Sequence, residues 1–311
     1  MRARTFWIGC LAPLTAHAFA CCGVSPKGEV VKFLDQRNII VWNAENKTEA
    51  FVRSARFKAK GKDFGFITPT PTVPKLEQVD PAAFETLEAA IKEHHDLFDN
   101  QLKGRGRGAT AGAPGVEVVQ IKKVGGYVAT TVKAASASGL AEWMRENGYH
   151  TTRPIQNWTD FYIAKKWYLT AFKVDAEAGR AETGLVKLTF QTDVPFNPYY
   201  VPADNIPEAH EGTGLAIYFV ADQVYDPTDA RTALRTLEVV PISNVLKYKL
   251  RTQLKLGWVP KMPMLTLMAD KGFPRESSDD VFFEPVVTTL FSSAYFAQLS
   301  SPVVRFDGGN L

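Results

Sequence analysis

An alternating segment from residue 51 to residue 59 most constrains the fold of this 311-residue chain. Phe51, Ala55 and Phe57 share one face of an extended strand, and the opposite face is mostly polar. Residues 30–33 and 39–42 have the composition of strands, and residues 35–38 between them have that of a turn. The sequence therefore predicts half-buried antiparallel hairpins in this region.

Two helices with recognisable ends follow. Asp80 before Pro81 is typical of a helix start, and apolar residues then recur at helical spacing as far as Leu102. A second helix is expected over residues 139–147, with Ser138 as its cap, an Asn-Gly stop, and Trp143 in its buried stripe. A short third helix is expected over residues 159–164.

Strands complete a mixed, largely antiparallel sheet with these helices packed on it, which is an α+β fold. Strands from both sides of a flexible glycine-rich loop near residues 103–115 are expected to share this one sheet. Thr68 to Pro74 contains three prolines, which lack the N–H of a central strand, so an extended edge is expected there. The further predicted strands are residues 116–121, 126–132, 167–174, 185–191 and 215–220.

The pattern becomes irregular after Asp222, because prolines interrupt it repeatedly. A helix is expected over residues 228–237 and strands over 245–250, 264–268 and 281–283. Residues 21–222 therefore form the expected α+β domain, and residues 223–311 are either a C-terminal extension or a second small domain.

The charge balance argues against a nucleic-acid partner, because 36 Lys and Arg residues face 33 Asp and Glu residues. No apolar run reaches the 18 or so residues that a membrane-spanning helix requires, so no transmembrane helix is expected in the mature chain.

The first twenty residues have the pattern of a secretory signal peptide. Arg2 and Arg4 precede a mostly apolar stretch, and Ala18 and Ala20 supply the small residues at which signal peptidase cuts. Cleavage after Ala20 would make Cys21 the first residue of an exported protein, in the periplasm or outside the cell.

Cys21 and Cys22 would then be the only cysteines of the mature chain, in a compartment that oxidises thiols. They could close a strained vicinal disulfide or pair with another chain. Alternatively, Cys21 could be acylated as in a lipoprotein, which is the one route by which the mature protein would be membrane-anchored. The residues before Cys21 fit a lipoprotein signal less well than ordinary cleavage.

Several segments together resemble an exported bacterial family, domain of unknown function 2330. The most specific is the helix end Trp143 to Tyr149, and Phe64 to Pro71, Phe161 to Ile163 and Leu188 to Phe190 are also similar. The resemblance covers about Cys22 to Val220. It implies export and a shared fold, and it supplies no catalytic residue.

Residues that could carry chemistry are few. The two adjacent histidines His94 and His95 point about 100° apart on a helix and cannot easily hold one metal ion. His150 and His210 have no partner at ligand spacing. No nucleophile motif and no phosphate loop is present, so we expect neither a cofactor nor a metal site.

Asp279, Asp280 and Glu284 could act as paired carboxylates, but turn residues of this kind are mostly solvated. Two functions therefore remain. The first is a non-catalytic binding or structural domain whose partner is an unknown envelope component, and the second is an envelope hydrolase that uses dispersed carboxylates.

Overall fold

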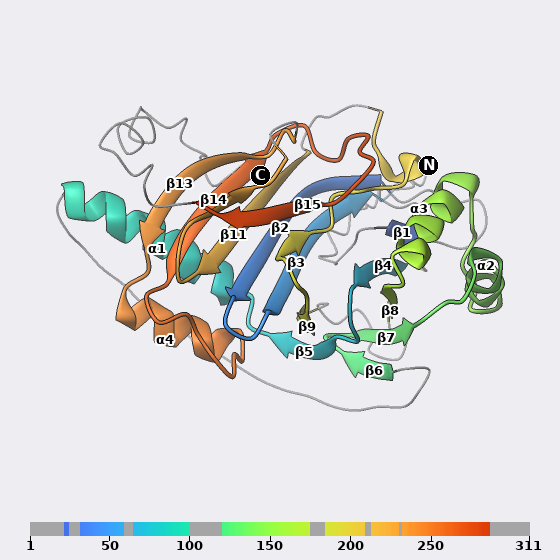
Figure 1. The fold of residues 1–311 in the computed structure, drawn as a ribbon, viewed down its shortest axis with the longest axis horizontal. Helices are drawn as coiled ribbons and strands as arrows, with labels where there is room; N and C mark the ends of the chain where they lie inside the picture. The colour runs from blue at the N-terminus through green and yellow to red at the C-terminus, as the bar shows by residue number, and fades with distance from the viewer. Residues whose placement is uncertain are drawn as a thin grey trace, which may run out of the picture.

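The computed structural model describes residues 22–24, 32–58, 65–99, 120–174, 184–208, 213–229 and 232–286. Within them the chain has an α+β fold with four α-helices and three sheets, as the sequence predicts (Figure 1). The one predicted sheet is in fact two large sheets and a small one. Strands from both sides of the glycine-rich loop contribute to each large sheet.

The largest sheet has seven strands, and the only parallel pair in it is β2 with β11. Two of its strands lie beyond Asp222, so the C-terminal region shares this sheet with the region before it. In spatial order the strands are β13 (Arg235–Pro241), β14 (Met264–Asp270), β11 (Gly214–Ala221), β2 (Lys32–Asn43), β3 (Thr48–Lys58), β9 (Leu185–Gln191) and β5 (Lys75–Val79).

The second sheet is antiparallel throughout and has five strands. In spatial order they are β1 (Cys22–Val24), β4 (Gly65–Thr70), β8 (Tyr168–Val174), β7 (Tyr127–Val132) and β6 (Gln120–Val124). A third, small sheet consists of β10 (Phe196–Asn197), β15 (Val281–Pro285) and β12 (Tyr225–Pro227).

Opposite faces of the seven-stranded sheet are covered differently. Helix α1 (Ala82–Asp99) lies on one face, where Phe84 meets Tyr218 of β11, and α4 (Asn244–Gln253) packs beside α1. Strand β15 crosses the other face, where Phe283 meets Phe219 (Figure 1). Neighbouring residues of β11 point to opposite faces, so this strand is buried on both sides, as its apolar composition predicts.

The five-stranded sheet separates two hydrophobic clusters. Phe66 stacks on Phe172, and Tyr127 meets both rings edge-on, within the larger cluster, which also contains the core of the seven-stranded sheet. On the other face, α2 (Ala137–Glu146) and α3 (Arg153–Ala164) cover Ile67 and Ala171. Helices α2 and α3 are therefore held on the side of the molecule away from α1 and α4 (Figure 1).

The predicted turn at residues 35–38 is wrong. These residues lie inside the long strand β2, where Asp35, Gln36 and Asn38 are buried. The chain instead turns at residues 44–47, where Lys47 adopts a positive φ of 52°. Strand β3 is also buried on both faces over residues 48–54, and not half-buried.

Two predictions beyond Asp222 exchange helix for strand. Part of the predicted helix at 228–237 belongs to strand β13, and the predicted strand at 245–250 is helix α4, which Ser243 caps by accepting from the N–H of Leu246. Tertiary packing decides here, since β13 pairs with β14 and α4 buries Leu250. The predicted strands at 264–268 and 281–283 are confirmed as β14 and β15.

Glycine and proline positions explain one hairpin turn and one strand edge. Gly125 and Gly126 form the tight turn between β6 and β7 with φ values of 59° and 77°, a geometry that β-hairpin turns of two residues require. Pro69 lies within β4, but β1 pairs only with residues 65–67 of that strand. Among the described residues, no strand pairs with the outer edge of β4 at Pro69, which agrees with the missing N–H of proline.

Candidate functional site

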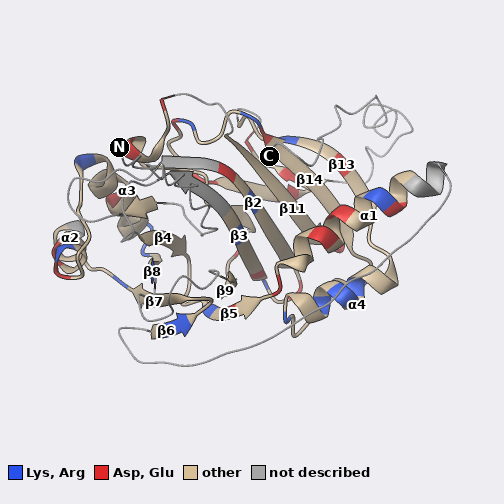
Figure 2. Ribbon diagram, turned by 180° about the vertical axis from the view of Figure 1, so that it is seen from behind, with Lys and Arg blue, Asp and Glu red and all other residues tan. Residues whose placement is uncertain are grey.

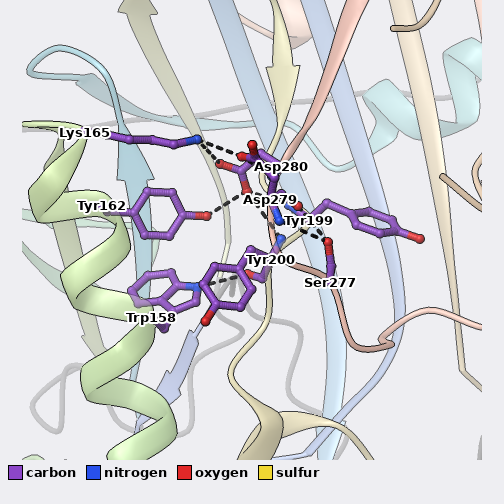
Figure 3. Close-up of polar contacts among 8 residues, drawn as sticks. All are labelled: Trp158, Tyr162, Lys165, Tyr199, Tyr200, Ser277, Asp279 and Asp280. Atoms are coloured by element: carbon purple, nitrogen blue, oxygen red, sulfur yellow. Dashed lines mark hydrogen bonds and ion pairs between the residues drawn. The ribbon is translucent and has the colours of Figure 1, made fainter. Parts of the chain in front are cut away.

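The most unusual side chain is Asp280, a fully buried carboxylate just before β15 (Figure 3). Its Oδ1 atom accepts three hydrogen bonds. The Tyr162 hydroxyl donates at 2.7 Å, and the backbone N–H groups of Tyr199 and Tyr200 donate at 3.0 and 3.4 Å. Asp280 therefore connects α3, the segment after β10, and the start of β15.

Helix α3 places the aromatic part of this cluster. Thr152 caps the helix by accepting from the N–H of Ile155 at 3.3 Å, and a proline in the first turn fixes φ. Trp158 and Tyr162 are four residues apart, so they lie on the same buried face. The Trp158 indole donates to the carbonyl of Tyr200 at 2.9 Å, which gives α3 a second contact with this segment (Figure 3).

Lys165 follows the last turn of α3 and is the cation of the cluster. Its Nζ lies 2.8 Å from Asp279 Oδ1 and 3.9 Å from Asp280 Oδ2. The same ammonium lies 4.2 Å from the ring centre of Phe161 and 5.1 Å from that of Trp167. Because aromatic faces attract cations, the rings and the two carboxylates together hold Lys165 in place.

Burial raises the pKa of Asp280 from 3.8 to about 6, although the Tyr162 hydroxyl and the charge of Lys165 act in the opposite direction. Among the described residues, none donates a hydrogen bond to the Oδ2 atom. A carboxyl that titrates near neutral pH has the acidity of a general acid or base. Its side chain is nevertheless fully inaccessible, so no substrate reaches it in this conformation.

Two other buried carboxylates hold the same segment. Glu49 accepts from the backbone N–H of Phe196 at 3.0 Å, and burial raises its pKa well above the ordinary value. Asp270 accepts from the Tyr199 hydroxyl at 2.5 Å and pairs with the Arg275 guanidinium. Residues 196–200 are thus fixed by three carboxylates from three strands or strand ends, which is an arrangement that orders the core.

An open groove of about 640 Å³ lies between α2 and α3. This volume is in the range of small-molecule sites. Arg145 pairs with Glu142 across 2.6 Å at its rim. The other ionisable residues that line the groove are His150, Arg153 and Asp160.

The family model for an uncharacterized protein conserved in bacteria (DUF2330) matches residues 15–250. The chain belongs to this family. The match confirms the resemblance that the sequence motifs indicate, and it extends beyond Val220 into α4. The family description assigns no activity to this DUF2330 protein.

Solved structures add a distant likeness only. A crystal structure of baculovirus P35 covers 85% of this DUF2330 chain and 99% of its own, with 8% sequence identity and a TM-score of 0.42. A mutated baculovirus P35 after caspase cleavage covers 81% and 100%, with 7% identity and a TM-score of 0.39. No curated protein matches the sequence.

The three carboxylates that the sequence suggests for acid–base chemistry differ in burial. In this DUF2330 chain Asp279 and Glu284 are exposed, and Asp280 alone of the three is buried. The solvated-turn interpretation is therefore wrong for Asp280. The sequence pattern did not indicate its partners Tyr162 and Lys165; the one available signal is that Tyr162 follows Trp158 at the helical spacing of four residues.

The predicted processing residues Ala18, Ala20 and Cys21 lie outside the described residues. Cys22 is fully buried in β1. The next residue, Gly23, exchanges two hydrogen bonds with the Asn205 side chain, at 2.9 and 3.2 Å. These bonds tie β1, an edge strand of the five-stranded sheet, to the 3-10 turn Ala203–Asn205.

The histidines considered as metal ligands are not grouped in the described residues. His94 is half-buried and His95 is exposed, where it bonds Glu238 at 2.9 Å; His150 lines the groove, and His210 lies outside the described residues. In the part of the chain that the structure describes, no three His, Cys, Asp or Glu side chains are grouped to hold a metal ion. No helix in that part is both long and apolar enough to cross a membrane.

Proposed function

We propose that this protein is an exported component of the bacterial envelope that binds an envelope component without catalysis. The observation that carries the proposal is the complete burial of Asp280. A hydrolase built from dispersed carboxylates needs an acid with a raised pKa in contact with its substrate. Among the described residues Asp280 has that acidity, and it is enclosed by Tyr162 and the backbone of Tyr199, where no substrate reaches it.

The groove between α2 and α3 is the proposed binding site. Buried Met144 of α2 and Trp158 of α3 hold both helices on the core beneath the groove, which favours a binding site that is formed before a ligand arrives. Arg153 and Asp160 are exposed and have opposite charges. Such a lining suits a polar ligand that carries hydroxyl, amide and carboxylate groups.

Export is supported by the N-terminal sequence and by the position of β1. The signal-like segment ends at Ala20, and two residues later Cys22 is already part of the five-stranded sheet. Cleavage after Ala20 would therefore leave β1 and the other described elements in the chain. Since the Cys22 side chain lies inside a hydrophobic cluster, it is a poor partner for a cysteine of another chain.

Intact-mass measurement of the protein from its native envelope tests export. We expect the mass of a chain that begins at Cys21, with Cys21 and Cys22 oxidised. A chain that retains residues 1–20 would contradict export. A mass that includes a diacylglycerol group would place the exported protein on a membrane surface, and two free thiols would reopen a redox or metal role.

Binding without catalysis is tested with soluble peptidoglycan fragments and isothermal titration calorimetry. We expect saturable binding that is weakened at least tenfold by Arg153→Gln with Asp160→Asn. Glu146→Gln is the matched control, because Glu146 is exposed on α2 but does not line the groove. Mass spectrometry after incubation should return the fragments unchanged, and cleaved fragments would favour the hydrolase.

A further inference from the structure

Residues 239–269 form the most one-sidedly charged part of the chain. They contain five of the 36 Lys and Arg residues and none of the 33 Asp and Glu residues. The rest of the chain holds 31 basic and 33 acidic residues, so it is close to neutral. Figure 2 shows basic residues on α4 and no acidic ones. The protein therefore presents one positive surface that is centred on α4.

Helix α4 buries one side and exposes the other. Leu246 and Leu250 face the core beside α1. Val245 and Tyr248 on the outer side are 76% and 60% exposed, which is unusual for large apolar side chains. At about 100° per residue they lie at the middle of the exposed face, with Lys249 on one side and the C-terminal basic residues on the other.

The loop after α4 extends this surface. Met262 is 78% exposed, and its backbone N–H is fixed by Asp222 Oδ1 at 2.9 Å. Lys247 of α4 donates to the carbonyl of Lys261 at 2.5 Å, so the loop and the helix are tied together. The α4 surface, defined as Val245, Tyr248, Lys249, Arg251, Lys255, Lys261 and Met262, thus combines apolar tips with cations on one fixed unit.

The cations of the α4 surface are largely unneutralised. Among the described residues, no carboxylate lies within 4 Å of Lys249, Arg251 or Lys255. Lys261 lies 4.0 Å from Glu45, with both side chains more than four-fifths exposed. Like charges gathered in this way repel one another, and an anionic partner would relieve the repulsion.

We propose that the α4 surface docks on the surface of an anionic phospholipid bilayer. Cations flanking an exposed apolar and aromatic stripe on a surface helix are what the interface of a membrane accommodates, with the apolar tips below the headgroups and the ammonium groups among the phosphates. A nucleic acid would use the cations but not Val245 or Met262. Because the rest of the chain is close to neutral, its charges would not oppose docking through the α4 surface.

Vesicle flotation of the full chain tests this proposal. One set of vesicles is phosphatidylcholine alone, and the other also contains about 30% phosphatidylglycerol, which is anionic. We expect binding to the anionic vesicles only, weakened by added salt. Neutralising Lys249, Arg251 and Lys255 with Gln should lower the partition coefficient about a hundredfold, from roughly fivefold per basic residue. Val245→Ser with Tyr248→Ser should lower it about tenfold while salt sensitivity remains.

The matched control replaces three exposed lysines elsewhere, Lys92, Lys133 and Lys173, with Gln. It removes the same charge and should bind as the parent does. Every variant keeps the same N-terminus, so a lipid on Cys21 would not produce the difference, and thermal melts verify folding. Equal binding to both vesicle types, unchanged binding by the α4 variant, or binding to soluble polyglutamate without binding to vesicles would overturn the proposal.

Discussion

Replacing Asp280 with Asn should make the free energy of unfolding less dependent on pH between about pH 4 and 7. The amide keeps an oxygen in the position that Tyr162 and the backbone of Tyr199 bond at 2.7 and 3.0 Å. Lys165 keeps its closer partner Asp279 at 2.8 Å, so the change leaves no isolated charge. What disappears is the ionisation of a carboxyl in the core.

The magnitude follows from the pKa of Asp280, about 6 in the folded protein against an ordinary 3.8. This difference corresponds to about 3 kcal/mol. Because the folded pKa is the higher one, the folded state holds the proton more tightly. The contribution of Asp280 to stability is therefore fully present below pH 4, is lost as pH rises towards 6, and stays lost above about pH 7.

Urea unfolding of the parent and of Asp280→Asn, at half-unit pH steps and constant ionic strength, measures this effect. We expect the free energy of unfolding of the parent, relative to the variant, to fall by about 3 kcal/mol between pH 4 and 7. Other titrating groups, Glu49 included, are common to both proteins and cancel. Asp280→Ala should destabilise at all pH values, since it strands the Tyr162 hydroxyl. If the free energies of unfolding of the parent and of the Asn variant change with pH in the same way, Asp280 is not a buried carboxyl that titrates in this range.

Three further predictions concern the fold, and urea unfolding checks each. Lys187→Met should cost about 3 kcal/mol, because the buried Lys187 ammonium bonds the end of α4 and pairs with Glu77 at 3.0 Å; no loss would show that the pair contributes nothing. Gly125→Ala should cost about 2 kcal/mol, since its φ is positive and a Cβ would lie 2.8 Å from a carbonyl oxygen; an unchanged midpoint would contradict this strain. Met144→Ala should lower the free energy of unfolding by about 3 kcal/mol and Trp143→Ala by less, because Met144 is fully buried and Trp143 only partly. A larger loss for Trp143→Ala would contradict this order.

Strong local signals in the sequence led to correct elements. The Asp80–Pro81 start of α1 is confirmed, with Asp80 accepting from the N–H of Ala82 at 3.0 Å. The Asn147–Gly148 stop of α2 is confirmed by the positive φ of Gly148. The cap of α2 is Ser136 and not the predicted Ser138. These features depend on a few neighbouring residues, so they can be predicted without knowledge of the rest of the chain.

The candidate site was only partly visible in the sequence. Asp279 and Asp280 were identified as a carboxylate pair, but their environments differ completely: one is exposed and the other has no accessible surface. The partners of Asp280 are Tyr162, 118 residues earlier in the chain, and the segment at Tyr199. No local pattern predicts such distant contacts.

The sequence by itself determined the family, the fold class and the elements whose ends are marked by caps, glycines or an unbroken apolar run such as β11. Only the tertiary structure decided that residues 35–38 continue β2 and that residues 245–250 are helical. It also decided that Asp280 is buried. For residues 35–38 and for Asp280 the physical reason is the same: polar residues favour turns and surfaces when nothing else contacts them, and only long-range strand pairing and hydrogen bonds make their burial stable. Residues 245–250 are helical because the helix buries Leu246 and Leu250 beside α1.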